Sequence, residues 1–419
     1  MITRLLAFST FVLVCFVLIS TPSHSQPQPV IIGHPACLSG KYAKIGTDVV
    51  AGIKACIDWT NETQGGVTID DQPHKLEYII YDCKSDKDQI TKLMDQLMFK
   101  DKADVIFAPY SSGLTSRGAP IAESHRRLYM VHGGANNAIF EQGYNFLVQT
   151  IGPASQYHHG VLEMAREIDP QAQRVALLYQ DDEFALTVMG GTLKHARQLG
   201  YEVVYKQTYP HGATRLTPLL SEMARTNPDL VLGGGHFRDG VIFCRQFSEI
   251  DFSPKALSLL VAAASPDFYH QLGSKAEGVL CPSHWEYGIA YSEQLAQEEG
   301  LLWIGPDQDE FVQRFKAHAD DEHMPGYHPA EAGAQVLAYA LGVERAGSTD
   351  PLKVRAALGE LTFFSFYGRW DIDETGLQVG HNMIDIQWQD GQRVIVWPQK
   401  AQTAPPMYPL PVAGENREQ

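Results

Sequence analysis

Short apolar runs alternate with longer segments in which apolar residues recur at helical spacing along most of this chain. An apolar run at 30–33 precedes a periodic segment at 46–61, and a second run at 76–81 precedes another periodic segment at 86–100. Short runs of this kind predict buried strands, and the i, i+3, i+4 recurrence predicts helices. Repeated strand–helix units of this length predict an α/β fold, with a parallel sheet covered by helices on both faces.

Two neighbouring predicted strands, 104–107 and 128–131, each end in a loop of small and polar residues. These loops contain Tyr110, Ser111 and Ser112 after the first strand, and Gly134, Ala135 and Asn136 after the second. In an open α/β sheet, ligands bind beyond the carboxyl ends of the strands. The two serines begin a predicted helix, where free backbone N–H groups and the positive end of the helix dipole suit a carboxylate. Ordinary helix capping by serine is the alternative explanation.

The strand–helix alternation starts again at a new first strand, 174–179, and continues to 279–281. The chain ends differently, because two β-patterned runs at 383–388 and 394–397 flank the turn Asp390-Gly391. This pattern predicts an antiparallel hairpin. Two similar lobes joined by several chain crossings would form a cleft, and a hinged cleft closes on a small ligand.

Length and charge agree with this organisation. A chain of 419 residues is too long for one compact core, and its net charge of −16 argues against nucleic acid or an anionic membrane as a partner. Arg4, an apolar run at 5–19 and small residues at Ser23 and Ser25 predict a secretory signal peptide over residues 1–25. An uncleaved membrane anchor is the alternative. The Pro-rich and polar tail at 399–419 is expected to be disordered.

Five cysteines remain after the predicted cleavage, and an exported protein can form disulfides. Cys37 and Cys83 each follow a predicted strand end, so this pair is the candidate disulfide. The chain has no Cys-x-x-Cys spacing and its histidines are scattered, which argues against a metal site. It also lacks the glycine spacing of a dinucleotide fingerprint and the Gly-x-Ser-x-Gly elbow of hydrolases, so neither a cofactor nor catalysis is expected.

Several short motifs recur in an order that identifies a family. They are Leu38-Ser39-Gly40, Asn61 with Gly65-Gly66, Tyr81-Asp82, Asn227-Pro228-Asp229, Ala276-Glu277-Gly278 and the Asp390-Gly391 hairpin. With the two loops described above, they make the chain resemble the type I periplasmic substrate-binding proteins of ABC importers, specifically the leucine/isoleucine/valine and amide-binding group. The resemblance covers nearly all of the mature chain.

The resemblance implies two doubly wound parallel-sheet lobes joined by a three-crossing hinge. Lobe one would comprise 30–149 plus 282–361, and lobe two 150–281 plus 362–398, with crossings near residues 150, 281 and 362. It also implies a periplasmic, monomeric, non-catalytic protein that captures a small solute and delivers it to an inner-membrane ABC permease. A ligand-sensing receptor of the same fold and an exported hydrolase are the alternatives.

The resemblance also assigns roles to individual residues. The loop of Tyr110, Ser111 and Ser112 would hold a ligand carboxylate or amide together with the loop of Gly134, Ala135 and Asn136. In lobe two, Phe184 and His236 occupy positions where relatives often have tyrosine, and Tyr42 and Trp285 would add stacking area. Core packing for Phe184, a surface histidine at 236 and hinge packing for Trp285 are the ordinary alternatives.

One expected residue type is missing. Amino-acid binders of the family commonly place a carboxylate for the ligand ammonium after the next strand of lobe two, where this chain has only apolar residues at 261–264. A buried ammonium without a charge partner is costly, which leaves Asp182, Glu183 and Asp239 as candidate substitutes. The expected ligand is therefore an amino acid, an amide or a small carboxylate.

Overall fold

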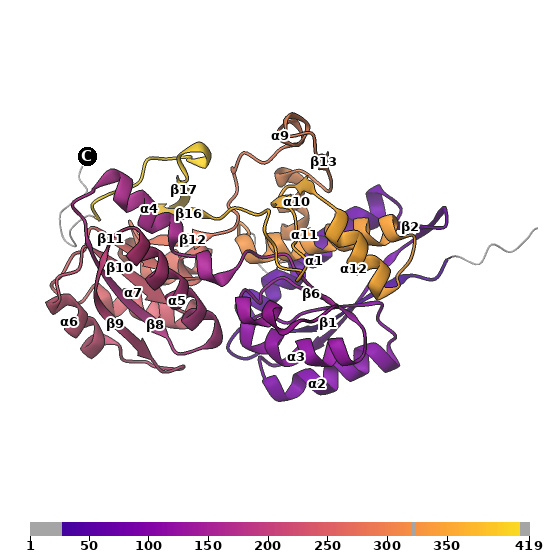
Figure 1. Cartoon of the computed structure of the whole chain (residues 1–419), viewed down its shortest axis with the longest axis horizontal. Coiled ribbons are helices and arrows are strands. Elements are labelled where there is room, and N and C mark those ends of the chain that lie inside the picture. The colour runs from indigo at the N-terminus through magenta and orange to yellow at the C-terminus, as the bar shows by residue number, and fades with distance from the viewer. Residues whose placement is uncertain (1–26, 320–322, 411–419) are drawn as a thin grey trace, which may run out of the picture.

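The computed structural model describes residues 27–319 and 323–410, which form two α/β lobes side by side (Figure 1). The predicted signal peptide lies outside the described residues. Both lobes have the parallel-sheet organisation that the sequence predicted. In the part of the chain that the structure describes, no helix is long and apolar enough to cross a bilayer.

The sheet of lobe one has five parallel strands among the described residues. Their order is β4 (Leu76–Asp82), β1 (Val30–Ala36), β5 (Val105–Phe107), β6 (Leu128–Val131) and β7 (Leu147–Gln149). Residues of β5, β6 and β7 are fully buried, as their apolar runs require of strands covered on both faces. A small hairpin of β2 (Val67–Ile69) and β3 (Gln72–His74) lies outside this sheet.

Helices from both ends of the chain cover this sheet. They are α1 (Ala43–Thr63), α2 (Lys87–Asp95, continued by a π-helical turn at Gln96–Lys100), α3 (Ser112–Ser124), α10 (Gln308–Lys316), α11 (Tyr327–Ala346) and α12 (Pro351–Glu360). The α1 helix packs on α10 and α11, and α2 packs on α3. Figure 1 shows the late helices, in orange, completing the lobe that begins in indigo.

The close packing of α1 on α11 depends on glycine. A side chain at Gly52 would overlap the backbone carbonyl of Pro329, and one at Gly333 would lie 2.9 Å from the sulfur of Cys56. Because the two helices touch through backbone atoms, no larger residue fits at Gly52 without moving them apart.

The sheet of lobe two contains seven strands in the described chain. Their order is β17 (Gln392–Trp397), β16 (Ile384–Gln389), β12 (Leu280–Ser283), β11 (Ala256–Leu259), β10 (Leu230–Gly234), β8 (Arg174–Gln180) and β9 (Glu202–Tyr209). The strands from β9 to β12 are parallel, and the predicted hairpin of β16 and β17 adds to β12 in antiparallel orientation. Its helices are α4 (His159–Ile168), α5 (Glu183–Gln198), α6 (Thr217–Arg225), α7 (Phe237–Phe247) and α8 (Pro266–Leu272).

The chain returns to lobe two later than the resemblance implied. Strands β14 (Phe363–Ser365) and β15 (Gly368–Trp370) pair with β13 (Leu302–Trp303), which follows the short helix α9 (Glu293–Glu298). The amide of Gln149, in β7, then donates to the carbonyl of Gly376 over 2.8 Å. The last crossing therefore follows Gly376 rather than falling near residue 362, because these segments complete the hydrogen bonding of lobe one.

Residues 399–410 are ordered, contrary to the prediction of a disordered tail from residue 399. The amide of Met407 donates to the Gln387 side chain over 2.7 Å, and Leu410 donates to the carbonyl of Lys255 over 2.7 Å. The tail is held because it satisfies polar groups at the edge of lobe two, which composition alone does not reveal. The remaining predicted tail, 411–419, lies outside the described residues.

Candidate functional site

The loops at the carboxyl ends of the two sheets meet between the lobes. The hydroxyl of Tyr110, beyond β5, lies 3.0 Å from Nδ1 of His236, which precedes α7 in lobe two. The hydroxyl of Thr187, in α5, donates to the side-chain oxygen of Asn136 over 2.9 Å. Residues from two predicted ligand loops therefore already touch the opposite lobe, so the structure describes a closed arrangement.

Glu183, at the start of α5, makes a second connection across the cleft. One carboxylate oxygen accepts from the hydroxyl of Ser116 over 2.7 Å, and the other lies 3.1 Å from the ammonium of Lys87. Both partners belong to lobe one. Since such bonds form only when the lobes are together, they favour the closed state.

A cavity of about 230 Å³ lies at this junction. Among the predicted ligand-binding residues, its wall contains Tyr42, Ser111, Ser112, Phe184 and His236. These residues come from four separate segments of the chain, so the strand-end reasoning brought together side chains that are far apart in sequence. The cavity is large enough for several water-sized groups.

The first serine of the loop, Ser111, does not cap helix α3 through its side chain. Ser111 is the N-cap of α3 and makes no side-chain capping hydrogen bond. The hydroxyl of Ser112 instead accepts from the backbone amide of Asn136 over 3.1 Å, which ties the two predicted loops together. Gly134 and Ala135 are buried beneath them, and a side chain at Gly134 would come within 2.6 Å of the Thr115 hydroxyl.

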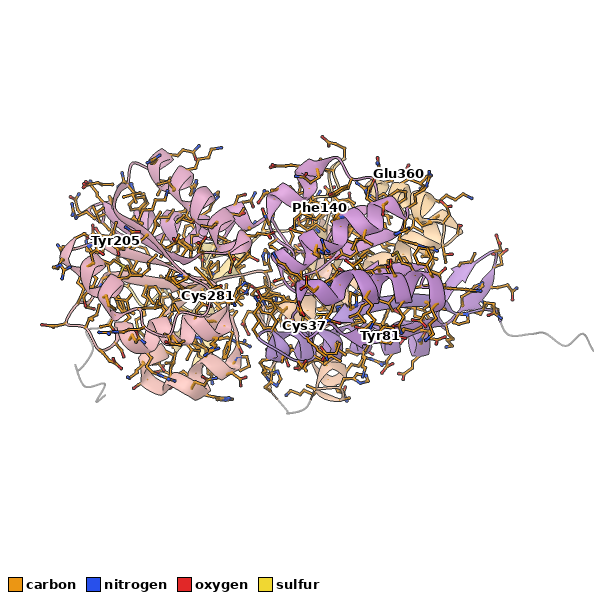
Figure 2. The ribbon with its side chains drawn as sticks, turned by 90° about the horizontal axis from the view of Figure 1, so that it is seen from below. Cys37, Tyr81, Phe140, Tyr205, Cys281 and Glu360 are labelled. Atoms are coloured by element: carbon orange, nitrogen blue, oxygen red, sulfur yellow. The ribbon has the colours of Figure 1, made fainter. Side chains whose placement is uncertain are left out.

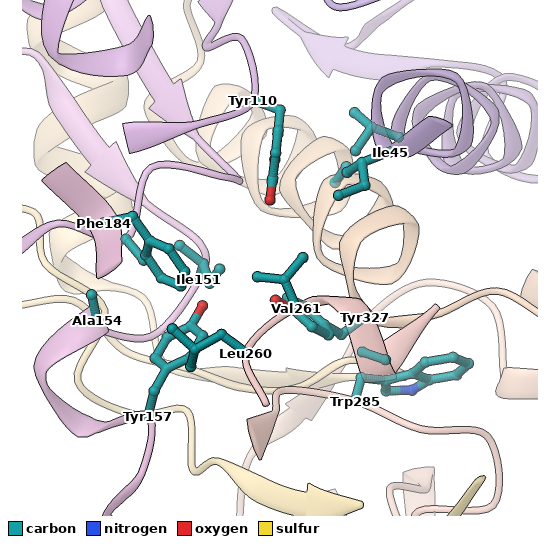
Figure 3. Close-up of a cluster of buried hydrophobic side chains, with 14 of the residues drawn as sticks. Ile45, Tyr110, Ile151, Ala154, Tyr157, Phe184, Leu260, Val261, Trp285 and Tyr327 are labelled. Carbon is teal, nitrogen blue, oxygen red and sulfur yellow. The ribbon is translucent and has the colours of Figure 1, made fainter. Parts of the chain in front are cut away.

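Seven aromatic side chains form a closed circuit of ring contacts between the lobes. In order, the circuit consists of Tyr110, His236, Phe184, Tyr157, His284, Tyr327, His328 and again Tyr110. Consecutive ring centroids are 4.0 to 5.8 Å apart. Figure 3 shows Tyr110, Phe184, Tyr157 and Tyr327 arranged around a common centre, with the hydroxyls of Tyr110 and Tyr157 directed toward it. We call this set the aromatic circuit.

Trp285 does not belong to this circuit. Its indole packs on Phe311 and Phe366, and its Nε1 donates to the backbone carbonyl of Phe366 over 2.9 Å. The neighbouring His284 faces the cleft instead. The indole of Trp285 thus finds its apolar surface and its hydrogen-bond acceptor inside lobe one.

Sequence reasoning missed four members of the circuit, which are Tyr157, His284, Tyr327 and His328. The first two follow the crossings expected near residues 150 and 281, where a hinge places side chains between lobes. That position was the available signal. The other two begin α11, and nothing in its periodicity distinguishes a turn that faces the opposite lobe from one that faces the core.

The acidic residues of lobe two are engaged by the protein itself. Burial alone would raise the pKa of Asp182, but the adjacent His236 ring, 3.2 Å away, and backbone hydrogen bonds lower it. Burial raises the pKa of Asp239, which accepts from the hydroxyl of Tyr209 over 2.5 Å and from the amide of His236 over 2.8 Å.

Cys37 and Cys83 lie together, with their sulfur atoms 3.2 Å apart, but they are free thiols here. The predicted proximity is correct, and the predicted bond is not formed in this structure. Cys37 also lies 3.2 Å from the carbonyl of Tyr110, and Figure 2 places it beside the junction of the lobes. No group of three or more histidine, cysteine or acidic side chains among residues 27–319 and 323–410 is arranged to hold a metal ion.

Two α/β lobes with facing strand ends, closed over an aromatic and polar site, define a bilobal binding protein. A family model described as periplasmic binding protein matches residues 29–393, and the chain belongs to this family. Its homologues and its fold are those of solute-binding receptors, not of enzymes.

Individual relatives agree with this assignment. A Leu/Ile/Val-binding protein homologue from Brucella abortus is 23% identical over 376 residues, covering 87% of this chain and 90% of the relative. A leucine-binding protein from Thermotoga maritima superposes with a TM-score of 0.74 at 20% identity, covering 87% of this chain and 97% of the other. A solute-binding protein from R. palustris, solved with benzoate, superposes with a TM-score of 0.71 at 17% identity, covering 88% and 95%.

Proposed function

We propose that this protein is an exported, monomeric solute receptor that binds a small polar solute between its lobes and delivers it to an inner-membrane ABC permease. The observation that carries the proposal is the aromatic circuit, to which both lobes contribute. A site that is complete only when the lobes meet couples ligand binding to closure, which is the signal that a permease needs. Family membership and the predicted signal peptide at 1–25 support the location and the partner.

The solute would bind first to lobe one. The N-terminus of α3, with the hydroxyls of Ser111 and Ser112 at the cavity wall, offers hydrogen-bond donors and a positive dipole end to a carboxylate or amide. Closure then brings Phe184 and His236 over the bound group. Tyr42 adds a third aromatic wall, since its ring lies 4.9 Å from that of His236.

A thermal-shift screen tests the proposal. The mature protein is unfolded and refolded to remove carried ligand, and its melting temperature is then measured against amino acids, amides, amines and small carboxylates. A true ligand at a hundred times its dissociation constant should add about 2.7 kcal/mol of stability, or several degrees. If no compound in these classes shifts the midpoint, the proposed receptor function is wrong.

Ser112→Ala then tests the position of the site. We expect this variant to weaken binding of the identified solute by about 1 to 3 kcal/mol, because it removes a buried hydroxyl that also holds the amide of Asn136. Ser124→Ala is the matched control, since this hydroxyl lies at the exposed far end of the same helix. Equal affinities of the two variants, measured by calorimetry, would place the solute elsewhere.

A further inference from the structure

Glu331 is a fully buried carboxyl group in the second turn of α11, with an exposed fraction of 0%. Burial raises the pKa of Tyr110, Tyr157, Tyr327 and Tyr367, and in each case the negative charge of Glu331 adds to the effect. Three of these four tyrosines belong to the aromatic circuit, and they come from different segments. One carboxyl oxygen of Glu331 lies 3.1 Å from Nδ1 of His328, a member of the aromatic circuit, so the carboxyl group lies beside the circuit.

No protein cation neutralises this carboxyl group within the described residues. The basic side chain that contacts it there is His328, whose Nδ1 lies 3.1 Å from a carboxyl oxygen of Glu331. Burial, helped by His132 and His236, lowers the pKa of His328 well below its usual value, so this imidazole is neutral. The second contact is the hydroxyl of Tyr367, at 3.5 Å. Burial consequently raises the pKa of Glu331 well above its usual value.

Other polar groups beside Glu331 are also short of partners. In the described chain, Nε2 of His328 and Nε2 of Gln335 are buried without a hydrogen-bond partner. Both ring nitrogens of His284, a member of the aromatic circuit, also lack a hydrogen-bond partner there. Buried polar groups are normally satisfied, so a cluster of unsatisfied ones around a carboxyl group indicates a place where a polar ligand is bound.

The candidate acids from lobe two cannot serve in the same way. Asp182 is paired with His236, Glu183 accepts from Ser116 and Lys87, and Asp239 accepts from Tyr209. Glu183 and Asp239 are thus held by hydrogen-bond donors of the protein, and the His236 ring lowers the pKa of Asp182, although Oδ2 of Asp182 has no hydrogen-bond partner in the described chain. Glu331, by contrast, meets a neutral histidine and a tyrosine hydroxyl, and no Lys or Arg of the described residues pairs with it.

We propose that Glu331 is the counter-ion for a cationic nitrogen of the solute, so that the ligand is a small amine or amino acid rather than a plain carboxylate. This inference rests on the proposed receptor function. A buried carboxylate is stable when a cation meets it, and the solute supplies the cation on closure. The hydroxyls of Tyr110 and Tyr157, directed toward the centre of the circuit, add hydrogen-bond acceptors for the cation. The missing carboxylate of lobe two is thus replaced from lobe one.

Pairs of compounds that differ in a charged nitrogen test the inference. The probes are leucine against isocaproate, phenylalanine against hydrocinnamate, choline against dimethylbutanol and benzylamine against benzyl alcohol, each measured by thermal shift and calorimetry. We expect at least one nitrogen-bearing member to bind and its partner to fail. Glu331→Gln should then lower affinity by about a hundredfold, because the ligand charge is left buried and unpaired.

Asp385→Asn is the matched control. Asp385 is equally buried, and burial raises its pKa too, but it lies in β16, away from the circuit. We expect this variant to keep the affinity of the unaltered protein. If both variants lose affinity together, a general loss of folding explains the effect, and the assignment of Glu331 is overturned.

Proton release gives a readout that does not depend on a variant folding. Burial raises the pKa of Glu331 in the ligand-free protein, whereas a ligand cation would hold the carboxylate ionised, so binding should release protons, measured by calorimetry in buffers of different ionisation enthalpy. The groups that face it, Tyr110, Tyr157, Tyr327, Tyr367 and His328, are neutral in both states. Absence of release would overturn the inference.

The outcomes separate the inference from the function on which it rests. Binding of an isostere without the nitrogen as tightly as its nitrogen-bearing partner, unaffected by Glu331→Gln, would overturn the inference and leave the receptor function standing. No shift with this panel or with any compound of the wider thermal-shift screen would overturn both.

Discussion

The pair of Glu286 and Arg393 should make the stability of this protein depend on pH in an unexpected direction. Glu286 follows β12, and its exposed fraction is only 4%. One carboxylate oxygen lies 3.0 Å from the guanidinium of Arg393, in β17, which also donates to the carbonyls of Ala264 and Pro325. Burial raises the pKa of Glu286 to about 7, against the attraction of Arg393.

The size of the effect follows from this pKa. The usual glutamate value is 4.5, and a folded-state value of about 7 corresponds to about 3 kcal/mol of stability linked to the proton. The sign is that of an acid whose pKa is raised on folding. The contribution of Glu286 to the free energy of unfolding is fully present at pH values below its pKa in the unfolded chain. This contribution is lost as the pH rises through the pKa of Glu286 in the folded protein.

Glu286→Gln removes this proton while keeping the shape of the side chain. The free energy of unfolding is measured in urea from about pH 4 to about pH 8 for both proteins, and the difference isolates the one group. As the pH rises across this range, the free energy of unfolding of the variant should increase by about 3 kcal/mol relative to that of the unaltered protein. Glu202→Gln, in an exposed ion pair with Arg174, should follow the unaltered protein.

The result that would refute this reasoning is a difference curve that is flat or that falls with pH. A falling curve would mean that attraction by Arg393 exceeds the cost of burying the carboxylate. The pair would then act as a conventional stabilising salt bridge, and the pKa of Glu286 would lie below its usual value.

Two further substitutions test other contacts. Tyr110→Phe removes the hydroxyl that contacts His236 across the cleft, and it should weaken solute binding by about 1 to 3 kcal/mol in calorimetry. Tyr201→Phe removes a buried hydrogen bond within lobe two and should leave the affinity for the solute unchanged. Equal effects of the two variants would contradict an interlobe role for Tyr110. Gly52→Ala should lower the free energy of unfolding by about 1 to 3 kcal/mol, because the added methyl group overlaps α11. Gly190→Ala, whose methyl group meets open space beside α5, should leave the free energy of unfolding unchanged. A Gly52→Ala variant of unchanged stability would show that α1 and α11 can separate.

The sequence predicted the sheets well, because strands covered on both faces are continuous apolar runs and need no knowledge of their partners. The same reasoning located the cleft, since parallel strands bring their carboxyl ends to one edge. Ser112 and His236 illustrate this, as they lie at the same cavity although different lobes carry them. The position of a residue at a strand end is local information, and it was sufficient.

Other features depend on contacts that no local pattern records. Glu331 lies on a helix whose residues are almost all buried, so its neighbours give no clue that one turn faces the opposite lobe. Trp285 and His284 are adjacent in sequence, and only the packing of lobe one decides which of them faces the cleft. The ordered tail at 399–410 is polar, and it is held by hydrogen bonds to residues such as Gln387 and Lys255.

The interleaving of the chain has a consequence for how the protein is made. Lobe one lacks α10, α11 and α12 until its last third is synthesised, and the lobe-two sheet has an unpaired edge at β12 until β16 arrives. An incomplete chain therefore exposes both an uncovered apolar face and an open strand edge, which favour aggregation. A chain that crossed a membrane unfolded, as the proposed export implies, would avoid this intermediate by folding only after its C-terminus had crossed. No single cut in the sequence yields a self-sufficient lobe.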